Sequence, residues 1–515
     1  MRTLTALLLT FALLVCPAIA QKYLGPGSPG SGGFSPVLRV TKPNAGDPNF
    51  NISMSLGMGG ATGILVLSPN ATNVLMGNLP IYVDLGTALT PFLPIALDGP
   101  PGVPGAGSFT LPASLVGVSG PSVAGISFAI QAALAEPGQV VVTNGILATL
   151  QMEPSIAVAS SVAGTADPFA LIDPLGLSTL FQGGAAETNN VNGVAYADNG
   201  RTLYVLSNGN TIVRRDMTVP APSPWTLVLP LVNAIGVAEG NIQFDPCDQL
   251  LWFLADIGGG FQFHALDANP SSATFEQVLY STNNVGTNLV GTWALSPSGD
   301  RICLPELFNG GIRVWDTEPT SPTFLQNVDL WQPPIPIPLP TSMIPSSGAS
   351  GFWVNSKVAF STTEQEIFVL RQGTAATPAE IAVYSFAQQG WIDFDPASPE
   401  VNNIGPLANP PVVLGSAPVS LAVAPGTNSL FVSGFGGAGF AGRIDNPLAV
   451  GAVTYTPVTG FSLANAWRST LSPNGDRVAI ASGSPFQLRI LDLNTLAVQA
   501  TLPLGMSDAT NIVWH

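Results

Sequence analysis

Charged side chains are scarce in this 515-residue chain, where Asp, Glu, Lys and Arg together make up 9% of the residues. Globular domains carry roughly 25%, and this shortage argues against coiled coils, long helical bundles and charge-rich disordered proteins. Glycine and proline are abundant instead, at 55 and 48 residues, without the Gly-X-Y period of collagen. The sequence predicts an all-β protein in which many short strands are joined by many turns.

Cysteine and histidine are nearly absent. The chain has three cysteines and two histidines, and it contains no C-x-x-C or H-x-x-x-H spacing. These counts exclude Cys/His metal clusters. Cys247 and Cys303 are too few for the disulfide framework of a large exported protein, and the sequence does not decide whether they pair. His264 and His515 have no nucleophile partner in a recognisable pattern, so no catalytic residue is predicted.

The N-terminus has the pattern of an export signal. Arg2 precedes an apolar segment over residues 7–15, and Ala18-Ile-Ala20 forms an A-x-A cleavage site, which predicts a signal peptide over residues 1–20. Cys16 offers the alternative of a lipoprotein signal, although Val15 stands where a small residue is expected. Every later apolar stretch is broken by proline or polar residues, so no transmembrane segment is predicted. We expect an exported protein that is extracellular, periplasmic or associated with the cell surface.

Acidic residues outnumber basic ones by 31 to 15, which gives a net charge of −16. Nucleic acid is excluded as a partner because its binding needs a basic patch. Most of the negative charge falls in residues 151–515, where it favours solubility. Asp393, Asp395 and Glu400 are candidate oxygen ligands for Ca²⁺ or, alternatively, a solvated acidic loop. No other cofactor is predicted.

The first part of the chain predicts a small β-domain. Residues 21–35 are rich in Gly, Pro and Ser, which is typical of a linker. The turn-separated apolar runs that follow predict a β-sandwich over residues 36–150. These runs cover residues 63–67, 79–85, 108–111, 125–134 and 139–150. The stretch resembles a small glycine-rich sandwich module that recurs in exported bacterial proteins.

A repeat occupies residues 153–515. Each copy has an apolar strand, a turn, a second strand and a third strand that ends near an acidic or polar residue. The intervals are close to or longer than the ~40–50 residues of a four-stranded propeller blade. Ser-Pro-x-Gly-Asp-Arg at 296–301 and 472–477 supplies hairpin turns, since Pro presets φ and Gly accepts a positive φ. The copies begin at residues 193, 241, 292, 357, 420 and 469.

A seventh blade is split between the two ends of this region. Residues 510–515 predict a lone first strand, and residues 155–160, 169–173 and 177–181 parallel the later strands of the sixth copy. Pairing the two ends within one blade closes the ring and leaves no exposed radial edge. The sequence therefore predicts a seven-bladed β-propeller over residues 153–515.

The repeat carries a family resemblance. Leu203-Tyr-Val-Leu-Ser-Asn208, followed by Thr211-Ile-Val213 and combined with the Ser-Pro-x-Gly-Asp-Arg turns, resembles the YVTN-type seven-bladed propeller, within the wider WD40-like and lactonase-like group. The resemblance covers roughly residues 153–515 and implies a fold more than an activity, because propellers host many functions. Lactonase-like members are enzymes that use acidic, His and Arg residues in the central channel. No matching catalytic motif is present here, so none is carried over.

The channel mouth is the predicted binding site. In a propeller the first strand of each blade lines the axis, and residues at its start face one mouth. One interpretation is a polar mouth that binds a protein, a glycan or a small polar ligand. The other is that Asn caps the turns between blades and that Arg468 pairs with Glu239. The predicted ligand-binding residues are Asn192, Glu239, Asn241, Asn288, Asn355, Lys357, Arg468 and Asn511.

Three functions stay open from the sequence. The main hypothesis is an exported, non-catalytic binding protein with the sandwich as an accessory module. The alternatives are a lactonase-like hydrolase acting in the central channel and a structural role at the cell surface. Two insertions have no assigned role: the proline-rich residues 331–352, which we expect at the channel mouth, and residues 388–411, which enlarge the fifth blade.

Overall fold

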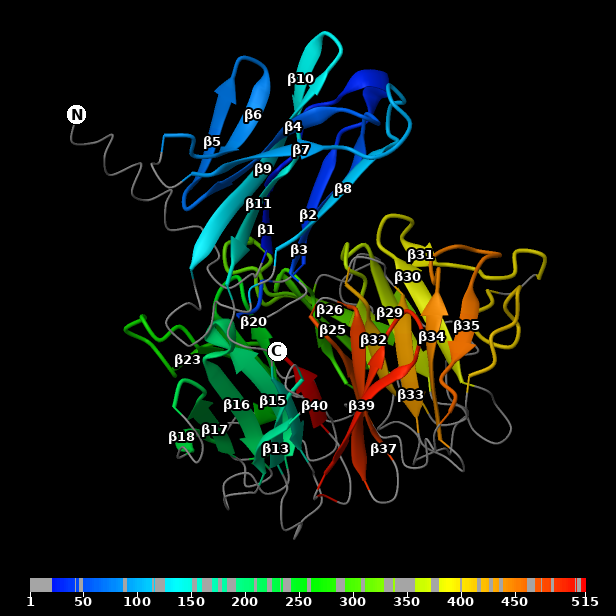
Figure 1. Cartoon of the computed structure of the whole chain (residues 1–515). Coiled ribbons are helices and arrows are strands. Elements are labelled where there is room, and N and C mark those ends of the chain that lie inside the picture. Colours follow the sequence, from blue (N-terminus) through cyan, green and yellow to red (C-terminus); the bar gives the residue numbers. More distant parts are fainter. Residues whose placement is uncertain are drawn as a thin grey trace. The chain divides into compact units, whose positions relative to one another are not determined.

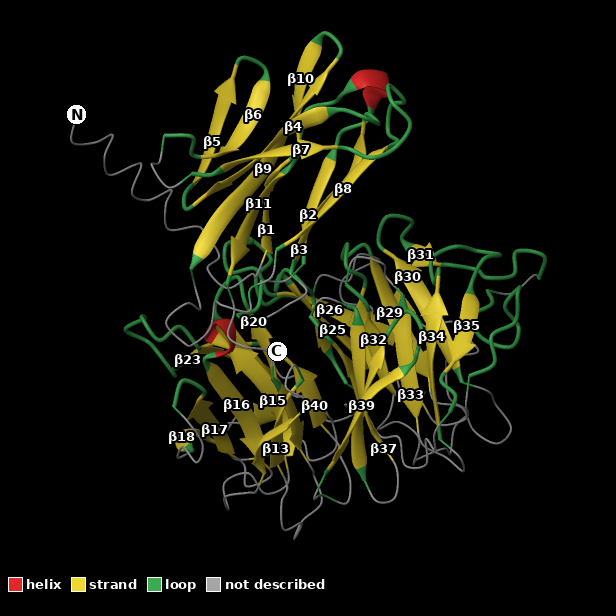
Figure 2. Ribbon diagram, viewed as in Figure 1, coloured by secondary structure: helices red, strands yellow, loops and turns green. Residues whose placement is uncertain are grey.

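In the computed structural model, every described strand pair is antiparallel, and the predicted all-β fold is confirmed (Figure 2). Helical structure among the described residues is limited to two 3-10 turns, Ser31–Gly33 and Asp198–Gly200, and no described helix is long and apolar enough to cross a membrane. The structure describes residues 21–41, 43–45, 50–86, 90–113, 115, 126–150, 155–159, 169–174, 178–182, 191–207, 211–219, 225–231, 233–234, 242–256, 261–283, 292–306, 311–327, 337–338, 357–371, 379–398, 401–414, 418–425, 429–434, 439–460, 468–473, 475–482, 486–504, 506 and 511–515.

The chain divides into two units, Met1–Pro154 with Asn199–Arg201, and Ser155–Asp198 with Thr202–His515. The first unit has a six-stranded sheet of order β1-β11-β9-β4-β7, with β10 paired to β9, beside a three-stranded sheet β2-β3-β8 and a hairpin β5-β6 (Figure 1). The bounds are β1 (Gln21–Gly25), β2 (Val37–Val40), β3 (Asn51–Gly57), β4 (Thr62–Ser68), β5 (Ala71–Met76), β6 (Leu79–Val83), β7 (Phe92–Ala96), β8 (Gly107–Pro112), β9 (Ser127–Glu136), β10 (Gln139–Val142) and β11 (Gly145–Thr149).

Strand β9 of the six-stranded sheet is covered on both faces. Neighbouring residues in a strand point to opposite faces, and in β9 Ile130 packs with Leu38 and Ile52 of the three-stranded sheet. Its neighbour Ala129 packs with Ile81 of the β5-β6 hairpin in a second core cluster. Full burial of a side chain such as Leu or Ile contributes about 1.5–3 kcal/mol. The hydrophobic alternation of these strands therefore sets which sheet covers which face.

Residues 21–25 form a strand, so the predicted linker over residues 21–35 is wrong in its first five residues. β1 pairs with β11 from Gln21↔Ala148 to Gly25↔Gly145, and Leu24 packs against the cluster beneath the hairpin. Glycine, proline and serine dominate only from Gly25 onward. A five-residue edge strand is too short for its own periodicity to outweigh that composition.

The described part of the second unit contains seven sheets, six of four strands and one of five. From the inner strand outward, the first four are β40 (Asn511–Trp514), β12 (Ile156–Ala159), β13 (Phe169–Asp173), β14 (Ser178–Gln182); β15 (Val191–Ala197), β16 (Thr202–Ser207), β17 (Thr211–Asp216), β18 (Thr226–Pro230); β19 (Asn233–Ala234) and β20 (Ile242–Asp245), β21 (Leu250–Asp256), β22 (Phe261–Asp267), β23 (Val278–Ser281); and β24 (Ala294–Leu295), β25 (Arg301–Glu306), β26 (Gly311–Asp316), β27 (Ile337–Pro338).

The other three sheets follow the same pattern. They are β28 (Lys357–Phe360), β29 (Glu366–Arg371), β30 (Glu380–Ser385), β31 (Gly390–Trp391); β32 (Pro418–Val423), β33 (Leu430–Gly434), β34 (Phe440–Asp445), β35 (Thr454–Pro457); and β36 (Arg468–Leu471), β37 (Arg477–Ser482), β38 (Gln487–Asp492), β39 (Val498–Pro503). The inner strands β15, β20, β24, β28, β32, β36 and β40 each contact the next in that order, and β40 contacts β15. This arrangement is β-propeller-like.

The two ends of the repeat region share one sheet, and the predicted pairing is confirmed. β40 pairs with β12 in a register that runs from Ile156↔Trp514 to Ala159↔Asn511. The side chains of Ile156 and Trp514 lie in one core cluster with Ile490 of the neighbouring sheet. The pairing covers the inner edge of β12, which would otherwise expose unpaired backbone groups.

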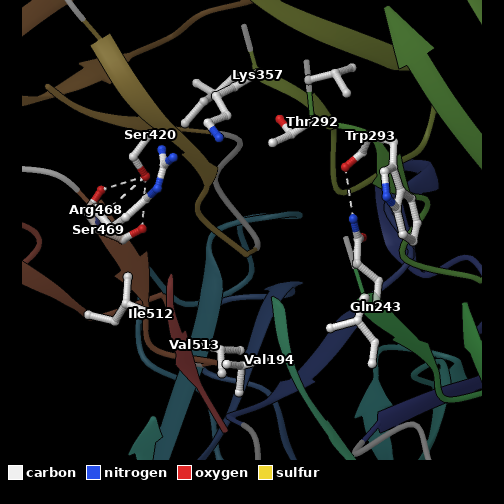
Figure 3. Close-up of a pocket in the computed structure, with 13 residues that line it drawn as sticks. Val194, Gln243, Thr292, Trp293, Lys357, Ser420, Arg468, Ser469, Ile512 and Val513 are labelled. Carbon is white, nitrogen blue, oxygen red and sulfur yellow. Dashed lines mark hydrogen bonds between the residues drawn. The ribbon is translucent and has the colours of Figure 1, made fainter. Parts of the chain in front are cut away.

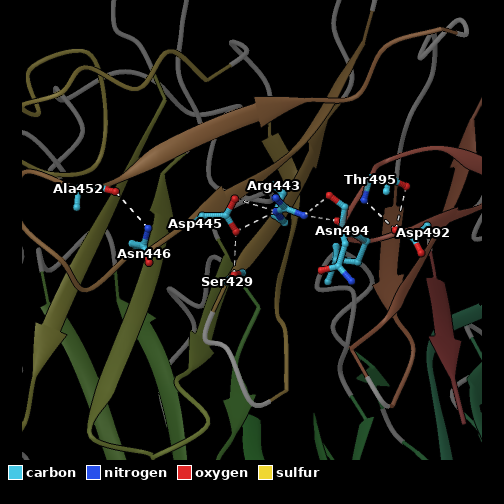
Figure 4. A network of polar contacts seen from close by, with 9 residues as sticks. Ser429, Arg443, Asp445, Asn446, Ala452, Asp492, Asn494 and Thr495 are labelled. Carbon is cyan, nitrogen blue, oxygen red and sulfur yellow. Dashed lines mark hydrogen bonds and ion pairs between the residues drawn. The ribbon is translucent and has the colours of Figure 1, made fainter. Parts of the chain in front are cut away.

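Arg443 links two adjacent sheets near their outer strands (Figure 4). Its Nη1 donates to the backbone carbonyls of Leu493 and Asn494, at 2.6 and 2.7 Å, in the turn between β38 and β39. Its Nε donates to Asp445 Oδ2 at 2.9 Å, and Asp445 also accepts a hydrogen bond from Ser429 at 3.0 Å. A rigid guanidinium therefore holds the turn of one sheet against a strand of the next.

The described part of the proline-rich insertion lies at an outer edge. Ile337–Pro338 pairs with Gly311 and Ile312 as the outermost strand of its sheet. The expectation that the insertion lies at the channel mouth is wrong for this dipeptide, because a proline is tolerated in an edge strand, where one side needs no backbone donor. The other residues of 331–352 lie outside the described residues.

The second insertion, residues 388–411, packs into the core. Phe394 and Ile404 are buried in a cluster with Phe368 and Val432 of two neighbouring sheets. The backbone of Ile404 also exchanges hydrogen bonds with Ile381 of β30, at 2.9 and 3.0 Å. This insertion therefore covers the outer part of its sheet.

We expect Gly299→Ala to reduce the free energy of unfolding of the second unit by about 2–3 kcal/mol, beyond the roughly 1 kcal/mol cost of a positive φ alone. Gly299 has φ +88°, and an added Cβ would stand 2.3 Å from Asp245 Cγ. That buried carboxylate cannot move freely, because its Oδ1 accepts hydrogen bonds from the backbone of Cys247 and Asp248. Gly451→Ala is the matched control, since its φ is +81° and no atom lies within 4 Å. If urea denaturation shows that the two variants lose the same free energy of unfolding, the proposed clash with Asp245 is contradicted.

Candidate functional site

Residues of six of the seven inner strands, together with Thr292 and Trp293 just before the seventh, β24, line one cavity of about 250 Å³ (Figure 3). Each segment is the innermost part of a different sheet, so the cavity lies on the axis around which the inner strands are arranged. Its lining residues are Val194, Ile242, Gln243, Thr292, Trp293, Lys357, Val358, Ser420, Leu421, Arg468, Ser469, Ile512 and Val513.

Two cationic side chains give the cavity a positive side. Lys357 of β28 is 7% exposed and Arg468 of β36 is 5% exposed. Figure 3 shows the Lys357 ammonium and the Arg468 guanidinium directed toward the same part of the cavity. None of the described lining residues is acidic. The described lining residues therefore carry a net positive charge, opposite in sign to the net charge of −16 of the chain.

Burial changes the protonation of both groups. It lowers the pKa of Lys357 to about 7 and that of Arg468 to about 9. The cause is the same for both: the charged form loses hydration when it is removed from water. At neutral pH Lys357 therefore exchanges between ammonium and amine, whereas Arg468 stays protonated.

A group of serine hydroxyls fixes the wall beside Arg468. Ser420 Oγ donates to the backbone carbonyl of Ser469 at 3.0 Å, and Ser469 Oγ donates to Ser420 Oγ at 3.1 Å. Ser433 Oγ of β33 donates to Ser469 Oγ at 3.0 Å. These bonds connect two sheets through buried side chains, where a satisfied polar network holds one geometry.

The opposite wall is held by an amide and is otherwise largely apolar. Gln243 Nε2 donates to the carbonyl of Trp293 at 2.9 Å, and Gln243 Oε1 accepts from the backbone of Leu295 at 2.9 Å. Gln243 thereby joins β20 to the segment that leads into β24. Val194 and Val513 complete this side (Figure 3). The cavity therefore has a cationic and hydroxylic side and an apolar side.

Of the eight predicted site residues, Lys357 and Arg468 line the cavity. Asn192 and Asn511 lie in β15 and β40, but their side chains are not described. The predicted Asn-rich mouth and the Glu239–Arg468 pair therefore stay predictions. The remaining four, Glu239, Asn241, Asn288 and Asn355, lie outside the described residues.

Thr292 and Gln243 line the cavity but are absent from the predicted set. For Thr292 a signal exists in the sequence. Thr292, Lys357, Ser420 and Arg468 each stand four residues before the end of the first apolar segment of their repeat, at Ser296, Ser361, Ala424 and Ser472. Aligning the repeats by their turns would have assigned Thr292 to the same face. Gln243 has no such signal, because only the fold brings it to the wall.

Histidine and cysteine take no part in this cavity. His264 is fully buried in β22, where Nδ1 lies 2.7 Å from Ser281 Oγ and Nε2 lies 3.2 Å from the carbonyl oxygen of Ala255. His515 is buried next to the ring of Tyr196. Cys247 and Cys303 form no disulfide with each other. None of these four residues lines the axial cavity.

The acidic loop proposed for Ca²⁺ is partly described. Asp393 Oδ1 accepts hydrogen bonds from the backbone of Asp395 and Asn402, each at 3.0 Å. Glu400 lies outside the described residues. Within the ranges that the structure describes, no group of three or more His, Cys, Asp or Glu side chains is placed to hold a metal ion. The Asp393 carboxylate thus closes its own loop, and calcium binding stays a prediction.

No family model and no curated protein matches this chain. Among solved structures, it is similar to the periplasmic gluconolactonase of Pseudomonas aeruginosa, with 15% identity over 70% of this chain and 98% of that chain and a TM-score of 0.47. It is also similar to a candidate 6-phosphogluconolactonase of Bacteroides fragilis, with 10% identity, 70% and 98% coverage and a TM-score of 0.47. These names correspond to the hydrolase alternative rather than to the main hypothesis from the sequence. Identities and TM-scores this low do not transfer an activity.

Proposed function

We propose that this protein is an exported binding protein whose second unit, a seven-bladed β-propeller over residues 153–515, takes a small polar ligand into its axial cavity. The convergence of residues from six inner strands, and from the segment just before β24, on one cavity supports this function most directly. A concave site with apolar walls and a few convergent polar groups is typical of small-molecule binding. The β-sandwich over residues 36–150 is then an accessory module, and residues 1–20 direct export.

The size of the cavity favours a small ligand over a protein or a glycan chain. At about 250 Å³ it lies just below the roughly 300–1,000 Å³ of pockets for drug-sized molecules. A folded partner or an oligosaccharide would have to bind at the mouth and leave the cavity empty. The polar groups on the axis would then have no role in recognition.

Thermal unfolding with a panel of small polar compounds tests this function. A ligand at 100 times its Kd stabilises the folded state by about 2.7 kcal/mol. We expect Ile512→Trp, which fills the cavity, to abolish the stabilisation. Val498→Trp is the matched control, because Val498 lies on the outer strand β39 and is 42% exposed. A ligand that stabilises both variants equally would bind elsewhere and overturn the proposal.

A lactonase-like hydrolase is the second candidate, and the pKa of Lys357 favours it. An amine with a pKa of about 7 can accept a proton from an attacking water at neutral pH. If the protein is a hydrolase, we expect the rate of lactone hydrolysis to rise as the pH passes 7. Lys357→Met should then remove this rise from the pH profile. If it is a binding protein, neither the wild type nor Lys357→Met should hydrolyse a lactone. Assays over a panel of sugar lactones from pH 5 to 9 separate the two.

A further inference from the structure

The outer strand of the β5-β6 hairpin in the first unit has an open edge. β6 packs on the six-stranded sheet through Ile81 and Val83, whereas β5 pairs with β6 alone among the described strands. Figure 1 shows β5 as the outer strand of this hairpin. We propose that β5 pairs antiparallel with β5 of a second copy of this chain, with Leu75 on the twofold axis. This self-association goes beyond the proposed function and does not depend on the axial cavity.

Apolar side chains on both faces of β5 are exposed. Val74 and Met76 stand opposite Ile81 and Leu79 of β6, so they share the face that β6 turns toward the core. They are nevertheless 50% and 58% exposed, and Leu75 on the other face is 75% exposed. β5 therefore extends beyond the sheet that covers β6. Three consecutive exposed apolar side chains on an open edge are typical of an interaction surface.

The backbone of this edge has room for another strand. Residues 50–86 are described without a gap. Within the described part of the chain, residues 71–76 form backbone hydrogen bonds only to β6. The other side of an edge strand presents a row of N–H and C=O groups to water. An extended strand of a partner pairs with all of these groups at once.

Three other sheet edges of the first unit carry residues that hinder strand pairing. Lys22 lies in the edge strand β1, Arg39 in β2 and Pro94 in β7. Charged side chains and prolines commonly protect an edge from pairing with another chain. β5 has neither, and its register shift falls between residues 71 and 74. The unprotected and regular part of the edge is therefore residues 74–76.

The charge distribution favours a second copy over a charged partner or a membrane. Residues 48–135 contain two charged side chains, Asp84 and Asp98, so this region offers few ion pairs to a basic or acidic partner. Two copies can meet there with little repulsion, although the whole chain carries a net charge of −16. A lipid surface would remove water from the open backbone groups without replacing their hydrogen bonds, which is costly. A second β5 is uncharged and supplies those bonds.

The sequence of β5 is complementary to itself in one antiparallel register. With Leu75 on the twofold axis, Leu75 faces its own copy, and Val74 of each chain faces Met76 of the other. Apolar side chains then meet at all three positions, with Cβ atoms about 4.5–5.5 Å apart. Such an isologous contact uses both open edges and closes at a dimer. Because one strand pair is smaller than the roughly 1,200 Å² of a stable interface, we expect the dimer to dissociate on dilution.

Sedimentation velocity of the exported chain, residues 21–515, over a range of concentrations tests the inference. We expect the wild type to change from monomer to dimer as its concentration rises. Leu75→Lys should raise the dissociation constant of the dimer at least tenfold, because two ammonium groups would meet on the axis. The variant should stay folded, which circular dichroism checks, because Leu75 is exposed.

Val140→Lys is the matched control for the added charge. Val140 lies on β10 of the same unit and is 52% exposed, so the substitution adds the same charge at a similarly exposed apolar position outside β5. We expect this variant to dimerise as the wild type does. A wild type that stays monomeric overturns the inference, and so does a control variant that weakens the dimer as much as Leu75→Lys.

A cysteine on the twofold axis tests the register. Under mild oxidation Leu75→Cys should form a covalent dimer on a non-reducing gel. Val140→Cys and the wild type, which keeps Cys247 and Cys303, measure the background. A dimer that Leu75→Lys disrupts but Leu75→Cys does not cross-link would place β5 against another strand of the second copy, and this result overturns the pairing.

Two further measurements separate this surface from a membrane contact and from the axial cavity. A monomeric wild type that co-sediments with phosphatidylcholine vesicles, when Leu75→Lys does not, overturns the inference in favour of a lipid surface. Ile512→Trp, which fills the axial cavity, should leave the dimer unchanged. Ligand binding and dimerisation can therefore fail independently, and loss of the dimer in Ile512→Trp counts against β5 as the contact.

Discussion

Trp514→Ala is expected to lower the free energy of unfolding of the second unit by about 3–5 kcal/mol, the range for removing a buried aromatic side chain. Trp514 belongs to β40 and is 9% exposed. It pairs with Ile156 of β12 and packs in a cluster that includes Ile490 of the adjacent sheet. The substitution therefore leaves a cavity where the two ends of the repeat region meet.

A second consequence follows from the position of β40. This strand joins residues that are more than 350 positions apart in the sequence, and it contacts the inner strands on both sides, β36 and β15. If β40 detaches, β12 exposes an unpaired edge, which is a template for aggregation. We therefore expect the variant to aggregate at lower temperature than the wild type, as measured by light scattering during heating.

Denaturation followed by far-ultraviolet circular dichroism measures the loss without relying on the removed tryptophan. Val498→Ala on β39 is the control, because Val498 is 42% exposed and its truncation should change stability by less than about 0.5 kcal/mol. Similar losses in the two variants would show that the shared sheet is no more important than an exposed outer strand.

Lys357→Met is expected to stabilise the second unit by about 4 kcal/mol near pH 6–7, because burial shifts the lysine pKa by more than three units and each unit corresponds to ~1.4 kcal/mol. The pKa is about 7 in the folded protein against a model value of 10.5. Methionine keeps a similar length and needs no hydration at its tip. The variant is thus expected to gain stability.

The gain should depend on pH in a defined direction. Between pH 7 and 10.5 the lysine is charged in the unfolded chain and mostly neutral in the folded one, so the unfolded state binds more protons. Wild-type stability attributable to this group therefore rises with pH across that window, and the advantage of methionine shrinks toward zero near pH 10.5. Below pH 7 both states are charged and the advantage is constant.

Urea denaturation of both proteins at several pH values from 6 to 10 tests this dependence. The difference between wild type and variant isolates Lys357 from the other groups that titrate in this range. Val498→Met on the outer strand β39 is the control, and its effect should not vary across the same window because Val498 is 42% exposed and carries no ionisable group. A difference for Lys357→Met that is constant with pH would mean that this lysine is not desolvated in the folded state.

Much of the strand order was readable from the sequence because its causes are local. The repeat copies predicted to begin at residues 357, 420 and 469 start within β28, β32 and β36. The turn at 296–301 joins β24 to β25, since proline and glycine restrict the backbone within a few residues. Strand β1 was not predicted, because it is short and its partner β11 lies more than 100 residues away in the sequence.

The sequence by itself determined the strand and turn pattern of the repeat, the pairing of the C-terminal strand with residues 156–159 and the location of Lys357 and Arg468 at the start of inner strands. Each of these depends on patterns that span about ten residues or on a repeat that can be compared with itself. The tertiary structure decided that Lys357 and Arg468 share one cavity with Ser420 and Val513, and that both cations are buried. Burial and proximity arise only when seven inner strands, which are spread over residues 191–514, meet around one axis, and no local sequence pattern indicates this arrangement.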